Sequence, residues 1–137
     1  MKRYFLAFIA LIVVAFAVQY GIEVLRPRLV EVFVYSGADP GSRLRRAFVL
    51  AAVVGFFRNF VSFGVAAWVL KKGAIAAGLS LFAAVFLGTL GYAWFISETT
   101  QEFLRLLTML SGLWPTIAAE FVGAFAGLCF GQWIATR

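Results

Sequence analysis

Two charged residues of opposite sign lie deep inside separate apolar stretches of this chain. Arg58 is the only charged residue in 47–70, and Glu120 is the only charged residue in 112–135. A charge at bilayer depth costs ~2.5–3.5 kcal/mol on insertion scales, so it usually faces protein or water and often marks function. Arg58 and Glu120 are therefore the first candidates for a functional site.

The composition is that of an integral membrane protein. The chain has 137 residues, of which 64% are hydrophobic and 13% charged. A soluble domain is ~45–50% apolar and ~25% charged. The length allows one domain, residues 1–137. The net charge of +6 would suggest nucleic acid in a soluble protein. Here the basic residues flank apolar stretches, so we expect anionic headgroups, and not nucleic acid, as their partners.

The residue types exclude several kinds of chemistry. The chain has no histidine, which excludes His-ligated haem, His-containing metal sites and His-based triads within it. The single cysteine, Cys129, cannot form an internal disulfide, and we expect it to be a small buried hydrophobe. The serines have no histidine to activate them. A Ser–Lys arrangement would need a lysine at membrane depth, whereas Lys71 and Lys72 lie at a membrane boundary. We therefore expect no enzymatic activity, no metal and no cofactor.

Hydropathy predicts an all-α, polytopic membrane protein with four transmembrane helices. Four apolar runs reach the ~20 residues needed to cross ~30 Å of hydrocarbon, at about 4–25, 47–70, 73–96 and 112–135. The beginning of the first run resembles a secretory signal. Because the run continues through Leu25, we expect it to remain as the first helix.

The connections between these runs predict the topology. Lys71-Lys72-Gly73 is a tight connection, so the second and third helices should form an antiparallel hairpin. Four crossings place both termini on one side of the cell membrane. Pro27 should kink or stop the first helix, and Ser42 is a candidate cap for the second. Thr99 and Glu102 fit a capping box, which predicts a short interfacial helix between the third and fourth spans, with a plain linker as the alternative.

The basic residues do not decide the orientation in the membrane. Five lie on the side of the termini: Lys2, Arg3, Lys71, Lys72 and Arg137. Six lie on the other side: Arg26, Arg28, Arg43, Arg45, Arg46 and Arg105. The positive-inside rule needs a larger asymmetry, and such a balance also permits insertion both ways and an antiparallel dimer. We expect the first five of the six to contact anionic headgroups.

Narrow faces of small residues accompany both charges. At 100° per residue, Glu120 shares an 80° arc with three glycines of the fourth helix, and Arg58 shares one with Gly55. The third helix has a similar face without a charge. Small residues at this spacing allow close approach of helices. We therefore predict helix packing at Gly55, Gly88, Gly91, Gly123, Gly127 and Gly131.

The two charges lie at similar depths in helices that should run parallel. Arg58 is roughly 16 Å from the start of its span and Glu120 roughly 12 Å from the start of its own. An arginine side chain can reach across that offset, so we predict an Arg58–Glu120 ion pair. The alternative is that either charge meets a symmetry mate or a different chain.

Three further polar residues are secondary candidates. Asn59 lies about 100° from Arg58 and is expected to hydrogen-bond to a neighbouring helix. Gln19 and Glu23, four residues apart, form a polar strip toward the loop side of the first helix. Because Glu23 lies near the end of its span, we favour a snorkelling interface residue over a site for it.

Two functions fit these residues. The ion pair is either a lock that fixes helix register, or a site where Glu120 exchanges a proton or cation and Arg58 engages an anion or tunes the carboxylate. We narrowly favour an oligomeric transporter or channel for a small solute or ion. The alternative is a non-catalytic accessory or assembly subunit of a larger membrane complex. Partners are then further copies of the chain or other membrane subunits.

Overall fold

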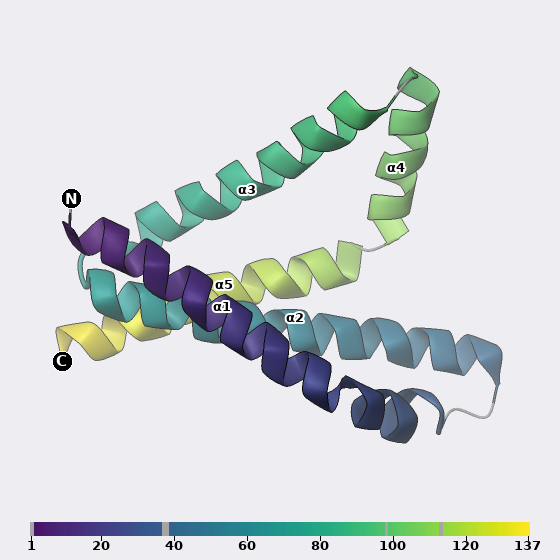
Figure 1. Cartoon of the computed structure of the whole chain (residues 1–137), viewed down its shortest axis with the longest axis horizontal. Coiled ribbons are helices and arrows are strands. Elements are labelled where there is room, and N and C mark those ends of the chain that lie inside the picture. The colour runs from purple at the N-terminus through teal and green to yellow at the C-terminus, as the bar shows by residue number, and fades with distance from the viewer. Residues whose placement is uncertain (1, 37–38, 98, 113) are drawn as a thin grey trace.

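The part of the chain that the structure describes is helical throughout. This computed structural model describes residues 2–36, 39–97, 99–112 and 114–137, with the backbone alone for 85, 89, 92, 93, 96 and 106–111. The elements are α1 (Lys2–Leu29), the π-helix η1 (Val30–Val34), α2 (Pro40–Leu70), α3 (Ala74–Ile96), α4 (Thr100–Gly112) and α5 (Trp114–Thr136) (Figure 1).

Three of these helical segments are long and apolar enough to cross a membrane. They are Lys2–Val34, Pro40–Leu70 and Trp114–Thr136, and Ala74–Gly88 within α3 is a shorter apolar helix. The chain is therefore a small multi-helix membrane protein, as its composition predicts. Both ends of the chain lie at the same end of the bundle (Figure 1).

Pro27 does not stop the first helix, although a stop is one of the two outcomes predicted for it. It lies inside α1, which continues to Leu29 and then widens into the π-helical turn of η1. Proline removes one backbone donor and crowds the carbonyl four residues earlier. Pro27 lies in the last turn of α1, so these costs fall close to the point where the regular α-helix ends and the π-turn begins.

The second helix begins earlier than its apolar run, and Asp39, not Ser42, is its N-cap. The Asp39 carboxylate accepts a 2.8 Å hydrogen bond from the Ser42 backbone N–H. The Asp39 backbone N–H in turn donates to the Ser42 hydroxyl, which completes a reciprocal capping box. Pro40 follows as the first helical residue, where its missing N–H is not needed. The basic first turn of α2 is thus helical and lies outside the apolar run.

The turn between α2 and α3 contains two residues with positive φ. Lys71 has φ 66° and Gly73 has φ 73°. Lys71 closes α2 with a hydrogen bond from its N–H to the Ala67 carbonyl, at 2.9 Å. Gly73 has no Cβ to oppose its conformation and serves as the N-cap of α3. The two helices are therefore joined within three residues.

Helices α2 and α5 pack in parallel and in very close contact. A Cβ atom on Gly123 would contact the backbone carbonyl of Phe56, and one on Gly127 would contact that of Phe60. A Cβ on Gly131 would contact the carbonyl of Gly64. Glycine alone permits this approach, which is the close packing expected of small residues spaced by four.

Helix α3 packs against the bundle only near its beginning. A Cβ on Gly78 would meet the side chain of Leu128, and the rings of Phe82 and Phe121 lie 5.2 Å apart. Beyond this region α3 diverges from α5, and α4 bridges their far ends (Figure 1). Around Gly88 and Gly91, nothing in the described chain lies within 4 Å of an added Cβ. In this structure, these two glycines of the predicted packing set therefore have no helix against them.

Helix α4 begins with a capping hydrogen bond at the predicted residues. The Glu102 backbone N–H donates to the Thr99 hydroxyl at 3.2 Å. The rings of Phe103 and Trp94 pack edge to face with centroids 4.8 Å apart, which joins α4 to the end of α3. The linker alternative is thus wrong for this segment, since residues 100–112 are helical.

Candidate functional site

The structure brings Arg58 and Glu120 into direct contact. The Nη2 of Arg58 lies 3.1 Å from Oε1 of Glu120, across the interface between α2 and α5. The two side chains are 32% and 31% exposed, so the pair is open on one side. An ion pair lowers the cost of holding either charge at this depth, and its open side leaves room for a further group.

The glycines of the α2–α5 interface position this pair. A Cβ on Gly55 would lie 2.6 Å from the Cγ of Glu120 and 2.9 Å from its Oε1. Gly55 therefore makes the space that the glutamate side chain occupies. Asn59 fixes the same turn of α5, because its side-chain amide donates to the Glu120 backbone carbonyl at 3.2 Å. Asn59 thus contacts the backbone of Glu120 and orients the glutamate without touching its carboxylate.

A chain of hydrogen bonds leads from the ion pair toward the loop end of α1. The Nη1 of Arg58 donates to Oε1 of Gln19 at 3.3 Å. The Gln19 amide donates to Oε1 of Glu23 at 2.9 Å. Glu23 in turn forms an ion pair with Arg26, with 3.1 Å between Oε2 and Nη1. Five side chains from three helices are connected in this way.

These side chains line one groove between α1, η1, α2 and α5. Its volume is about 330 Å³. The polar residues along it are Gln19, Glu23, Arg26, Arg58, Thr116 and Glu120, and the rest of the lining is apolar. Val30 and Val34 of η1 line it as well. We call this feature the polar groove.

The charges in the polar groove alternate in sign. Glu120, Arg58, Glu23 and Arg26 follow one another along the hydrogen-bonded chain, so the formal charge of the groove is zero. Within the described residues, no three His, Cys, Asp or Glu side chains lie together as a metal site would require. The arrangement suits transient binding of a small polar group or ion.

The polar groove contains every polar residue predicted for the site except Asn59, which contacts the backbone of Glu120 instead. Glu23 faces the groove and pairs with Arg26, although its position near the end of the span also fitted an interface residue. Arg26 and Thr116 were not predicted as members. The signals for them were present, since Arg26 lies three residues after Glu23 and Thr116 four before Glu120, on the same helical faces.

Comparisons with protein-family models, with curated proteins and with solved structures find no match for this chain.

Proposed function

We propose that this chain is a four-span transporter or channel for a small solute or ion and works as an oligomer. The observation that carries the proposal is the polar groove, which joins an intramembrane ion pair to the loop end of α1 through consecutive hydrogen bonds. Charged residues in membrane segments typically line substrate or ion pathways or proton relays.

The fourth span in this proposal is α3. Its 23 residues give a length of roughly 34 Å, enough to cross ~30 Å of hydrocarbon. Helix α4 then lies in the headgroup plane on the loop side. Trp68 and Trp133 mark one end of the bundle, Trp94 and Trp114 the other, and all four are exposed. Tryptophan is enriched at both membrane interfaces, which fits this placement and puts both termini on one side.

In this mechanism Glu120 carries the transported charge. Its Oε1 is held by Arg58, while the open side of the groove gives a proton or cation access to the carboxylate. Binding there weakens the hold of Arg58, which is then free to engage an anion or Gln19 alone. Gln19 and Glu23 supply intermediate positions toward the loop side. The proposed mechanism breaks no covalent bond, so the residues of the polar groove bind the transported group and do not catalyse a reaction.

A groove on the side of a small bundle needs a second wall before it can conduct. The chain has too few helices to surround a path, and many large apolar side chains of α1 and α2 are exposed, Phe16 and Phe57 among them. Further copies of the chain supply that wall most simply.

An accessory or assembly role is the second candidate. The direct contact between the Arg58 guanidinium and the Glu120 carboxylate favours it. A carboxylate bonded to arginine is a poor proton exchanger, and a buried pair can fix the register of α2 on α5 instead. In that case the partners are other membrane subunits.

Flux through liposomes separates the two candidates. The purified chain is reconstituted, and proton and cation currents are recorded on a solid-supported membrane across a panel of small ions and solutes. We expect current above protein-free liposomes for at least one of them, with loss of that current in Glu120→Gln and Arg58→Gln.

Glu31→Gln and Arg45→Gln are the matched controls, because both residues are exposed and lie outside the polar groove. They should conduct as the unmodified chain does. Absence of any current from a monodisperse oligomer, or equal currents from Glu120→Gln and Glu31→Gln, would overturn the transport proposal. Stable isolation only in a complex with another membrane protein would instead favour the accessory role.

A further inference from the structure

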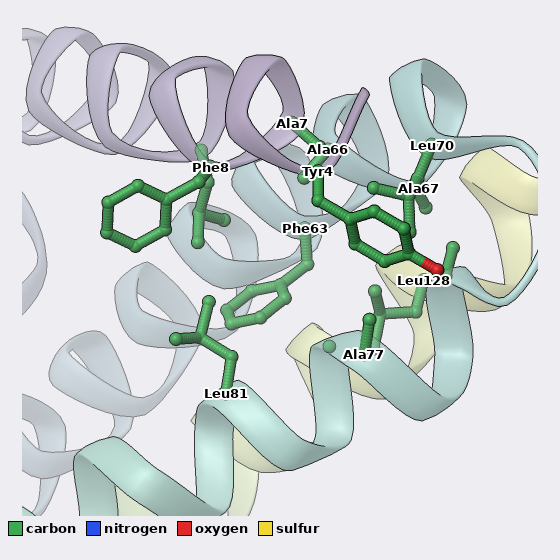
Figure 2. Close-up of a pocket in the computed structure, with 13 residues that line it drawn as sticks. Tyr4, Ala7, Phe8, Phe63, Ala66, Ala67, Leu70, Ala77, Leu81 and Leu128 are labelled. Atoms are coloured by element: carbon green, nitrogen blue, oxygen red, sulfur yellow. The ribbon is translucent and has the colours of Figure 1, made fainter. Parts of the chain in front are cut away.

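An apolar crevice lies at the end of the bundle where both termini lie. The polar groove runs toward the other end, the loop end of α1. It is formed by the first turns of α1, the last turns of α2 and the first turns of α3, and its volume is about 170 Å³ (Figure 2). Its lining runs from Leu70 and Ala74 beside the α2–α3 turn to Leu81 and Phe63, a depth of roughly 10 Å along the helices. We call it the Tyr4 crevice.

Tyr4 carries the only polar side-chain group among the residues that line the crevice. Figure 2 shows its ring standing between α1 and α3, with the hydroxyl oxygen as the one non-carbon atom among the side chains drawn. That oxygen would lie 3.8 Å from a Cβ on Gly73, so it lies beside the α2–α3 turn. A tyrosine in this position has its ring among apolar groups and its hydroxyl at the interface.

Four basic residues adjoin the lining residues at the end of the crevice beside the α2–α3 turn, and the sequence around them has no acid. Lys2 and Arg3 directly precede Tyr4, and Lys71 and Lys72 lie between Leu70 and Ala74. All four are exposed, and neither ion pair shown among the described residues involves them. The sequence has no Asp or Glu in 1–22, 59–97 or 121–137.

The positive charge of the protein is therefore concentrated at this end. The termini side has five basic residues and no acid, a net charge of +5. The loop side has six basic residues and five acids, a net charge of +1, and Arg58 and Glu120 cancel. The count of basic residues alone, five against six, does not show this asymmetry in net charge. An acid-free basic cluster at a membrane surface attracts anionic lipid headgroups.

We propose that the Tyr4 crevice binds one acyl chain of an anionic phospholipid, whose phosphate is held by Lys2, Arg3, Lys71 and Lys72. The crevice runs along the helices as an acyl chain runs in a bilayer, and it opens where the headgroup layer begins. The Tyr4 hydroxyl is placed to donate a hydrogen bond to the phosphate or the glycerol ester. This site is independent of the polar groove and of transport.

Native mass spectrometry of the full chain, released from nanodiscs with equal phosphatidylglycerol and phosphatidylcholine, tests the proposal. We expect phosphatidylglycerol to remain bound in preference to phosphatidylcholine. Lys71→Gln/Lys72→Gln should weaken its retention roughly tenfold, because two headgroup contacts are lost. Ala77→Leu and Ala66→Leu, which fill the crevice from α3 and from α2, should lower retention while the basic cluster stays intact.

Arg45→Gln/Arg105→Gln removes the same charge from exposed residues of the loop side. It is the matched control, because neither residue lines the Tyr4 crevice, so a headgroup contact of Arg45 holds no acyl chain in it. It should retain phosphatidylglycerol as the unmodified chain does, and helical circular dichroism of each variant verifies folding. Equal loss in the control pair, equal retention of both lipids, or no effect from either crevice-filling variant would overturn the proposal. None of these results depends on whether the chain conducts ions.

Discussion

Gly127 on α5 lies against the backbone carbonyl of Phe60 on α2, in a space that no other side chain fits. The same relationship holds one turn earlier for Gly123 and Phe56, and one turn later for Gly131 and Gly64. Three contacts at a spacing of four residues on both helices fix a single parallel register. That register places Glu120 beside Gly55 and within reach of Arg58.

Replacing Gly127 by alanine should therefore destabilise the protein. Its Cβ would overlap the Phe60 carbonyl, so the helices must separate, and overpacking of this kind costs about 1–3 kcal/mol. Unfolding of the reconstituted protein in mixed micelles of increasing sodium dodecyl sulfate measures the change. Gly88→Ala is the control, because an added Cβ there meets nothing within 4 Å among the described residues. A Gly127→Ala variant as stable as Gly88→Ala would contradict the packing.

The Arg58–Glu120 pair predicts a non-additive double-mutant cycle. Arg58→Met alone leaves an unpaired carboxylate in the interface and should cost about 2–3 kcal/mol of unfolding free energy. Glu120→Gln alone should cost a similar amount. The double variant should cost less than the sum by about 1–3 kcal/mol, since neither charge is then stranded. The same micelle titration of all four proteins gives the coupling, and strict additivity would show that the two side chains do not interact.

Much of this arrangement follows from the sequence, because the membrane imposes simple rules. Long apolar runs specify helices, and an isolated charge must face protein or water. Together with the glycine spacing on α5, these rules predict that Arg58 and Glu120 lie on facing sides of two parallel helices. The structure shows this contact at 3.1 Å.

Other features depend on partners that the sequence does not name. Small residues at Gly88 and Gly91 permit close approach but do not determine which helix approaches, and no described residue lies within 4 Å of a Cβ added at either position. The local rules for proline leave a kink or a stop open at Pro27, and only the structure shows that α1 continues to Leu29 and into η1. Arg26 joins the polar groove only because α1 crosses α2 so that Glu23 faces inward, which periodicity alone does not give.

The Asp39 cap predicts a loss of stability in acid. A hydrogen bond from the Ser42 backbone N–H holds the pKa of Asp39 below its ordinary value of 3.8. A lowered folded-state pKa means that the stabilisation is complete above the unfolded pKa, near 3.8, and is lost as the pH falls through the folded one. The protection of the first turn of α2 against hydrogen exchange, relative to the intrinsic rate at each pH, should therefore fall below about pH 4.

Asp39→Asn separates the loss of the Asp39 cap from other effects of acid on the protein. Asparagine still accepts the hydrogen bond of an N-cap but does not titrate. Exchange in this variant, measured by mass spectrometry, should lose the acid-dependent step in residues 41–44 while the rest of α2 behaves as before. If the full acid-dependent step in exchange persisted in Asp39→Asn, a titrating group other than Asp39 would be its cause.

Arg46 ties η1 to α2, and its removal should loosen the cover of the polar groove. Its Nη1 donates to the Phe33 carbonyl at 3.3 Å and to the Ser36 hydroxyl. Val30 and Val34 of this segment line the groove, and Val34 is buried. In Arg46→Gln, amides 31–36 should exchange about tenfold faster, since hydrogen bonds from a charged donor are lost.

Arg45→Gln is the matched control, because it removes the neighbouring charge but no hydrogen bond to η1 among those the structure shows. Its exchange in 31–36 should equal that of the unmodified chain. If η1 also limits access to Glu120, any current carried by the protein should rise in Arg46→Gln and stay unchanged in Arg45→Gln. Faster exchange without a change in current would mean that ions reach Glu120 from a side of the groove that η1 does not cover.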